Sequence, residues 1–114
     1  MKKVILLFLP LYAYGMDCRI DGSLENSTRM NCYIHSNMQI ELLDLECREG
    51  RFQIVWSNKV FEVDQAYQNN HESGIQSLVF QAQNASLKTT EYKLYHKAEL
   101  EIDNVVSDGL CFKK

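Results

Sequence analysis

Three residue types that together perform nucleophilic catalysis lie side by side in this chain of 114 residues, as His71, Glu72 and Ser73. In a catalytic relay the histidine takes the proton of the nucleophile while an acid orients the histidine. Neighbouring side chains of an extended chain point apart, so these three do not converge into a relay. The chain also lacks a Gly-x-Ser-x-Gly nucleophile elbow. We therefore expect a polar segment here, not a catalytic site.

A second pair of residues, Glu99 and Glu101, has a spacing that suits glycoside hydrolysis. On one strand face their Cα atoms would lie about 6.6–6.8 Å apart, comparable to the separation of the two carboxylates in glycosidases. Lys93 and Lys97 share that face and would hold both acids ionised. A solvated, charge-paired face explains the pattern better. We expect no catalytic residues, and an enzyme ranks third behind two binding functions.

The N-terminus has the order of features of a secretory signal. Lys2 and Lys3 precede the short apolar run 4–9, and the small residues Ala13 and Gly15 follow at the −3 and −1 positions of a cleavage site. The apolar run is too short to span a bilayer, which needs about 20 residues. An N-terminal core strand is the alternative. We predict a signal peptide over residues 1–15, cut after Gly15 or at Ala13, and a periplasmic or secreted protein with no stable membrane anchor.

The predicted mature chain, residues 16–114, is acidic and has the length of one domain. Without the two signal lysines it holds 10 basic and 15 acidic residues, a net charge of −5. Nucleic-acid binding needs clustered Lys and Arg to meet phosphates, so we expect no nucleic-acid partner. The negative field favours a cationic partner.

Four cysteines remain after processing: Cys18, Cys32, Cys47 and Cys111. An even number in a small exported domain indicates disulfides, and four cysteines allow three pairings. We favour Cys18–Cys32, which closes a short polar loop, and Cys47–Cys111, which ties the opening of the β region to its last strand. No close Cys-x-x-Cys or Cys/His pair is present, so we expect no metal site and no cofactor.

Alternation of apolar and polar residues predicts strands along most of the mature chain. It is strongest over 92–102, which carries His96 on its apolar side, where we expect a core histidine. In 38–47 the alternation changes phase, and we predict a β-bulge near Leu42 and Leu43, with a helix as the competing assignment. Glu49-Gly50, Ser57-Asn58-Lys59, Asn84-Ala85-Ser86 and Ser107-Asp108-Gly109 are predicted turns. The expected strands are 18–20, 30–35, 38–47, 52–56 (with Trp56 in the core), 60–63, 75–83, 92–102 and 110–112.

These strands together indicate an all-β domain with one solvated face and one apolar face. A small antiparallel β-barrel, or a strongly curled meander, stapled by two disulfides removes the exposed edges of such a sheet.

Residues 64–74 form the longest stretch without alternation, and they end in glycine. Connections this long in a compact domain often carry function. A solvated loop, or one turn of helix, with no partner is the alternative. Our candidates for contact with a partner are Asp64, Tyr67, His71, Glu72, Ser73 and Gly74.

Residues 45–111 resemble the periplasmic and membrane-bound C-type lysozyme inhibitors of Gram-negative bacteria. The shared features are a strand that ends in Leu45-Glu46-Cys47, a hairpin from Phe52 to Val63, Ser73-Gly74 before a strand, and a closing Cys111. The resemblance implies that Cys47 and Cys111 bracket a small antiparallel barrel. It also implies that the loop with Ser73 and Gly74 enters the cleft of a lysozyme. The chain departs from the family after Gly74, where Ile75-Gln76-Ser77 replaces a small-basic-tyrosine sequence, and in its additional N-terminal cysteine pair.

Two functional hypotheses follow. The first is an exported binding protein that inhibits a lysozyme-like cell-wall hydrolase, or neutralises a toxin as an immunity protein does. The second is a non-catalytic structural or accessory protein of the bacterial cell envelope, whose exposed strand edges pair with a larger assembly.

Overall fold

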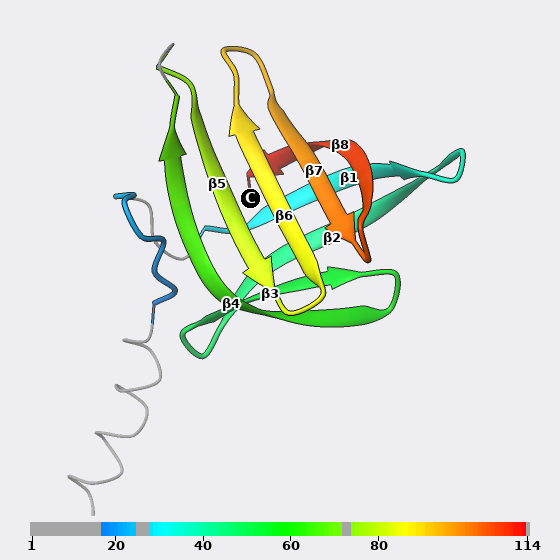
Figure 1. Cartoon of the computed structure of the whole chain (residues 1–114), viewed down its shortest axis with the longest axis horizontal. Helices are drawn as coiled ribbons and strands as arrows, with labels where there is room; N and C mark the ends of the chain where they lie inside the picture. The colour runs from blue at the N-terminus through cyan, green and yellow to red at the C-terminus, as the bar shows by residue number, and fades with distance from the viewer. Residues whose placement is uncertain (1–16, 25–27, 72–73, 114) are drawn as a thin grey trace, which may run out of the picture.

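The chain folds into a closed antiparallel β-barrel, shown in Figure 1. This is a computed structural model, and it describes residues 17–24, 28–71 and 74–113. Each strand pairs with the next in sequence, and the last pairs with the first, which confirms the predicted antiparallel barrel. The strands are β1 (Met30–Ser36), β2 (Gln39–Arg48), β3 (Arg51–Trp56), β4 (Lys59–Asn70), β5 (Gln76–Ala82), β6 (Ala85–Glu91), β7 (His96–Ile102) and β8 (Val105–Lys113).

A disulfide closes the barrel between the first and last strands. Cys32 of β1 lies directly opposite Cys111 of β8, and the two are bonded. Two residue pairs further along, Gly109 faces Ile34, where a Cβ at position 109 would collide with the backbone oxygen of Tyr33. Glycine at this position lets β1 and β8 approach closely enough to complete the ring.

Tight turns join most of the neighbouring strands. Four two-residue connections have positive φ at both central residues, which is the type I′ geometry that matches the right-handed twist of paired strands. Of the predicted turns, Glu49-Gly50 and Ser57-Asn58 are confirmed. The other two connections of this kind are Asn37-Met38 and Asp103-Asn104.

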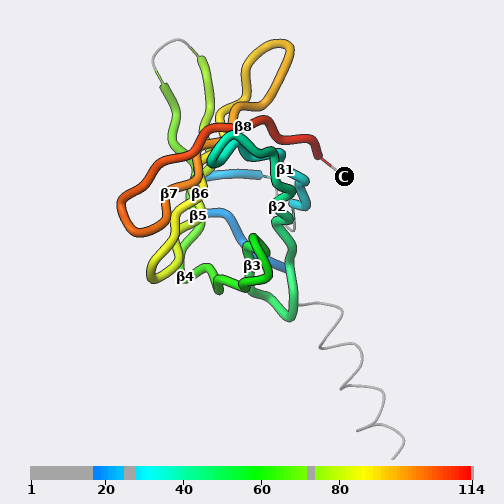
Figure 2. Tube along the Cα trace, turned by 90° about the vertical axis from the view of Figure 1, so that its right-hand side faces the viewer, coloured from blue at the N-terminus to red at the C-terminus, as the bar shows by residue number. Residues whose placement is uncertain are grey.

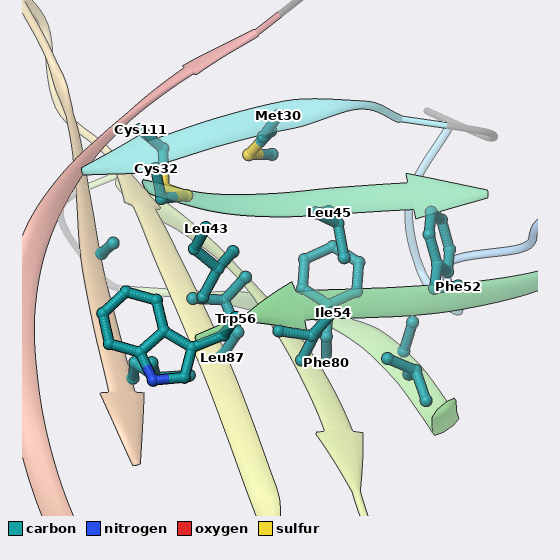
Figure 3. Packing of buried hydrophobic residues seen from close by; sticks show 14 of the residues in the cluster. Met30, Cys32, Leu43, Leu45, Phe52, Ile54, Trp56, Phe80, Leu87 and Cys111 are labelled. Atoms are coloured by element: carbon teal, nitrogen blue, oxygen red, sulfur yellow. A yellow bond between two sulfur atoms is a disulfide. The ribbon is translucent and has the colours of Figure 1, made fainter. Parts of the chain in front are cut away.

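The core fills the barrel with side chains from alternate positions of each strand (Figure 3). Phe80 and Leu87 lie opposite each other on β5 and β6, and both are fully buried. The rings of Phe80 and Phe52 meet edge to face at 5.1 Å between centroids. Trp56, at 8% exposure, lies in the core as predicted. Burial of this apolar surface is the main favourable contribution to folding.

The predicted bulge at Leu42 and Leu43 is wrong. The β1–β2 pairing runs through both residues without a shift in register, so Leu43 faces the core while Ile40 and Leu42 face outward, 69% and 47% exposed. The bulge that the structure does contain lies between Val63 and Gln65 of β4. The change of phase in the sequence therefore marks apolar residues on the outer surface, not a bulge.

The N-terminal segment 17–24 lies against the barrel instead of forming the predicted strand 18–20. Its one bridge is parallel, with Asp21 beside Tyr67, and the N–H of Asp21 donates to the carbonyl of Ala66 at 2.9 Å. Figure 1 shows this segment in blue beside β4. Cys18 and Ile20 belong to the core cluster. The segment thus covers the half of β4 that follows the bulge, where pairing with β3 has ended.

The predicted disulfide pairing is also wrong. Cys18 bonds to Cys47 and Cys32 bonds to Cys111. The cysteine that ties the first strand of the barrel to the last is Cys32 and not the predicted Cys47, because Cys32 lies in the strand that pairs with β8. Cys47 lies in the second strand, where it holds the N-terminal segment.

Two further expectations along the chain are corrected. The predicted strand 92–102 is wrong in its first part. Tyr92 and Tyr95 flank the tight connection between β6 and β7, and β7 begins only at His96. The predicted turn Ser107-Asp108-Gly109 lies inside β8. Apolar and polar residues alternate through the connection at 92–95 as they do in β7, so the periodicity alone does not show where the chain reverses.

Candidate functional site at the open end of the barrel

Two neighbouring hairpins extend the barrel at one end. The β4–β5 and β6–β7 hairpins project side by side beyond the ends of β1 and β8, as both views of the chain show (Figures 1 and 2). The register places Gln76, Glu91, His96 and Cys111 in one row across β5 to β8. The connections of the two hairpins therefore lie outside the last complete row of the barrel.

Most of the segment 64–74, predicted as a loop, belongs to strand β4. Only its end, after Asn70, forms a connection. The polar residues of 64–70 alternate between the outer surface and the barrel mouth, and backbone pairing with β5 holds them in a strand without an apolar pattern. The prediction failed because a strand with polar side chains on both faces shows no hydrophobic periodicity.

The predicted contact residues do not come together. Asp64 lies at the bulge and Tyr67 on the outer surface, where its hydroxyl accepts a 3.3 Å hydrogen bond from the Gln81 amide. Along β4, seven residues separate Asp64 from His71, about 23 Å at strand rise. His71 and Gly74 are at the hairpin connection, whereas Glu72 and Ser73 lie outside the described residues.

The β4–β5 connection is held by its own backbone. The N–H of His71 donates to the carbonyl of Ile75 at 2.8 Å, and the N–H of Gly74 donates to the carbonyl of His71 at 3.0 Å. Gly74 has a φ of +81°, a conformation that favours glycine, and no atom lies within 4 Å of where its Cβ would be. Gly74 thus presents its bare backbone to solvent.

The β6–β7 connection presents large side chains. Tyr92 and Tyr95 stack at 5.0 Å between ring centroids, and the N–H of Tyr92 donates to the carbonyl of Tyr95 at 2.8 Å. Leu94, between them, is 92% exposed. The two rings make this connection an ordered apolar projection beside the more polar one.

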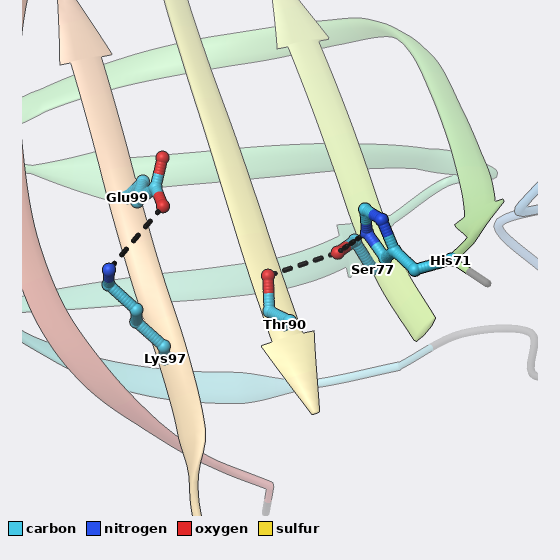
Figure 4. Close-up of polar contacts among 5 residues, drawn as sticks. All are labelled: His71, Ser77, Thr90, Lys97 and Glu99. Carbon is cyan, nitrogen blue, oxygen red and sulfur yellow. Dashed lines mark hydrogen bonds and ion pairs between the residues drawn. The ribbon is translucent and has the colours of Figure 1, made fainter. Parts of the chain in front are cut away.

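A short chain of hydrogen bonds anchors His71 to the outer surface of the barrel. Its Nε2 lies 2.9 Å from the Ser77 hydroxyl, which lies 3.0 Å from the Thr90 hydroxyl (Figure 4). A serine beside a histidine can act as a nucleophile, but Ser77 is fully buried. The arrangement therefore positions the end of the β4–β5 hairpin and ties it to β6.

Inside the projecting hairpins the barrel interior changes from apolar to polar. A pocket of about 330 Å³ opens there, with polar side chains from alternate strand positions that continue the core-facing series. Gln68 donates from its amide to the Asn70 side chain at 2.8 Å, and Gln76, Glu91 and His96 are consecutive partners across β5, β6 and β7. The pocket is lined by residues of the N-terminal segment and of the strands: Gly22, Ser23, Leu24, Met30, Gln68, Gln76, Leu78, Thr89, Glu91, His96 and Lys113.

Of the two carboxylates on the outside of β7, Glu99 forms an ion pair with one of the two expected lysines. Lys97 Nζ lies 3.7 Å from Glu99 Oε1, and both side chains are about 40% exposed (Figure 4). Surface pairs of this kind contribute little stability. Among residues 17–24, 28–71 and 74–113, no group of three or more His, Cys, Asp or Glu side chains is arranged to hold a metal ion.

The sequence did not point to the residues that line this end of the barrel. Gln76 and His96 fall in different predicted strands and Glu91 in none of them, and only the pairing of β5, β6 and β7 brings the three together. His96 was expected in the core, and it does face inward, half-buried at the mouth. The sole available signal was the switch from apolar to polar residues at inward positions.

No protein family model, curated protein or solved structure matches this chain. Two disulfides in so small a domain indicate an oxidising environment such as the periplasm or the extracellular space. In the part of the chain that the structure describes, no helix is long and apolar enough to cross a membrane.

Proposed function

We propose that this chain is an exported, non-catalytic binding protein that inhibits another macromolecule by inserting its two projecting hairpins into a concave surface. The proposed target is a lysozyme-like cell-wall hydrolase. A toxin is the alternative target, and the chain would then act as an immunity protein. The observation that carries the proposal is the paired projection of the β4–β5 and β6–β7 connections from one end of a closed barrel (Figure 1).

The barrel supports this use because hydrogen bonds fix the described residues that flank both connections before binding. Hydrogen bonds join His71 to Ser77 and Ser77 to Thr90, so the two hairpins are linked just below their tips. A preorganised binding surface loses less conformational entropy on association. The exposed Leu94 and the stacked tyrosines beside it are side chains of the kind that anchor protein interfaces.

The resemblance to C-type lysozyme inhibitors agrees with this choice of surface. The counterpart of the family's inserted Ser-Gly is Ser73-Gly74, and Gly74 is exposed at the β4–β5 connection. The predicted export and the net charge of −5 after signal removal suit a basic enzyme outside the cytoplasm.

The direct test is the muramidase activity of a basic C-type lysozyme with and without the oxidised 16–114 protein. We expect dose-dependent inhibition, and we expect Leu94→Ser to weaken it at least tenfold, as loss of an interface anchor does. Val105→Ser is the matched control, because Val105 is a 65% exposed apolar residue in the β7–β8 hairpin at the other end of the barrel. No inhibition by a folded, disulfide-bonded sample would refute lysozyme as the target.

A second candidate function, an accessory protein of the cell envelope, is favoured by one observation. The outer surface of β2, β1 and β8 carries exposed apolar residues that are cross-strand neighbours, with Leu42 opposite Tyr33 and Tyr33 opposite Leu110. Apolar patches of this kind often mark association surfaces. Because the barrel is closed, such an association would use this face and not the strand edges first expected.

The two candidates predict different sensitive residues. An accessory protein would be lost from its native envelope complex when Leu110 is changed to serine, and it would be retained when Leu94 is changed to serine. An inhibitor would show the reverse pattern. Co-purification of each variant with a tagged wild-type partner complex distinguishes the two functions.

A further inference from the structure

The pocket at the barrel mouth has a composition that selects a particular chemistry. We infer that it binds a cationic ammonium or guanidinium group carried on a short apolar stem. This site is distinct from the hairpin tips of the proposed function, since it lies on the inward face of the strands while His71 and Ser77 lie on the outward face. The inference does not depend on lysozyme being the target.

The charge preference comes from Glu91. It lines the pocket at the end of β6, and within the described residues its carboxylate makes no ion pair. Among the described residues that line the pocket, Lys113 also carries a full charge, and it is engaged in an interaction of its own. A cation entering the pocket therefore meets an available carboxylate, and the overall negative charge of the chain adds to the attraction.

Hydrogen-bond acceptors surround that carboxylate. Gln76 and His96 are the direct cross-strand partners of Glu91, on β5 and β7, and both line the same pocket. A side-chain amide oxygen and a neutral imidazole nitrogen can each accept from an N–H donor. An ammonium or guanidinium group can thus be held by one charged and two neutral acceptors, a combination in which the charge-assisted bond is the strongest.

The stem preference comes from the floor of the pocket. Leu78 is two residues from the fully buried Phe80 on the same face of β5, and Met30 is 1% exposed; both line the pocket. The floor of the pocket is therefore formed by the adjacent end of the hydrophobic core. A volume of about 330 Å³ at the mouth of a barrel lies within the range of small-ligand sites. It accommodates a stem of several methylene groups below the cationic head.

The test uses n-pentylammonium as the probe, with 1-pentanol and pentanoate as equal-length neutral and anionic controls. Binding to the oxidised 16–114 protein is followed by NMR through the Met30 and Leu78 methyl groups and the Gln68 and Gln76 side-chain amides. We expect saturable shifts with a Kd of about 1 mM, typical for a ligand of this size. Both controls should bind at least tenfold more weakly. Equal affinity for pentanol and pentylammonium, or no saturable shift, would overturn the inference.

A substitution isolates the carboxylate. Glu91→Gln removes one charge and keeps the shape, and we expect it to weaken pentylammonium binding about tenfold or more, because charge-assisted hydrogen bonds contribute at this level. Glu101→Gln is the matched control, since Glu101 is an exposed glutamate on the outer surface of β7 and does not line the pocket. Unchanged binding by the Glu91→Gln protein, with its spectrum otherwise native, would also overturn the inference.

A second probe identifies the source of the cation. Nα-acetyl-lysine methylamide carries the same stem and ammonium on a peptide unit. Binding comparable to pentylammonium would show that a lysine side chain of a protein partner can enter the mouth, whereas binding of pentylammonium alone would point to free amines. Lysozyme inhibition is measured separately, so failure of the proposed function would leave the pentylammonium result standing.

Discussion

The two ends of the barrel are built from the same strands and differ in nearly every other respect. One end is joined by two-residue connections, including Asn37-Met38, Ser57-Asn58 and Asp103-Asn104, and is lined by Trp56. The other end carries the two longer hairpins and a polar pocket. Tight turns and an aromatic side chain complete the core at the first end, and at the second end the strands continue beyond the core.

A change of side chain at inward positions is enough to turn a packed core into a polar pocket. On β6 the inward series runs from Leu87 through Thr89 to Glu91, and on β5 it runs from Phe80 through Leu78 to Gln76. Backbone pairing continues unchanged along both series. Strand pairing thus supplies the geometry, and the side chains decide whether the interior excludes water or receives a ligand.

The largest effect is expected when the ring itself is opened. Replacing both Cys32 and Cys111 with serine removes a cross-link between residues 79 apart in sequence, and the chain-entropy relation gives a loss of about 4.5 kcal/mol in the free energy of unfolding. Urea denaturation measures this loss. The same change at Cys18 and Cys47, with a separation of 29, should cost about 3.5 kcal/mol. A loss below that for the Cys18–Cys47 pair would show that closure is not the main constraint.

The next effect separates the core from the pocket floor. Leu87→Ala leaves a cavity beside fully buried neighbours, and we expect it to reduce the free energy of unfolding by about 3 kcal/mol. Leu78→Ala, at the half-buried floor of the open pocket, should cost about 1 kcal/mol, because solvent can enter the space. Equal losses in denaturation experiments would mean that the mouth is packed as tightly as the core.

A smaller effect is expected at the link between the projecting hairpins. Ser77→Ala removes the hydroxyl that joins His71 to Thr90, and a loss of about 1 kcal/mol in unfolding free energy is typical for such hydrogen bonds. Amide hydrogen exchange should also become faster near His71 and Thr90. Tyr67→Phe, which removes one exposed 3.3 Å hydrogen bond on β4, is the control and should leave that exchange unchanged.

The smallest effect on stability is expected at the tip. Leu94→Ser changes a side chain that is 92% exposed, so the free energy of unfolding should move by no more than about 0.5 kcal/mol. Its thermal and urea midpoints should match those of the Val105→Ser control. A large destabilisation would place Leu94 in the packing of the fold and not on a binding projection.

Much of the fold followed from residue patterns, because alternation reports which side of a strand meets the core. The barrel class, the turns at Glu49-Gly50 and Ser57-Asn58, and the burial of Trp56 were all predictable. Alternation failed where outer residues are apolar, as at Ile40 and Leu42, because the pattern then no longer distinguishes inside from outside.

The site was less predictable than the fold. The sequence indicates His71 and Gly74 as candidate contact residues. It does not indicate that the segment before them is a strand, because the polar side chains of β4 face the mouth and the surface alternately. Glu91 and His96 were separated from Gln76 in the sequence and met only through strand pairing. Similarly, the partner of Cys111 depended on which strand closes the barrel, and local patterns carry no information on closure.

The most direct test of the account is an NMR titration of the ¹⁵N-labelled, oxidised 16–114 protein with a basic C-type lysozyme. We expect backbone shifts and line broadening to concentrate in the connections 71–75 and 92–95 and to leave the turns Ser57-Asn58 and Asp103-Asn104 unaffected. Perturbations centred on those turns or on the outer surface of β2, β1 and β8, or none at all, would contradict the claim that the projecting hairpins bind such an enzyme.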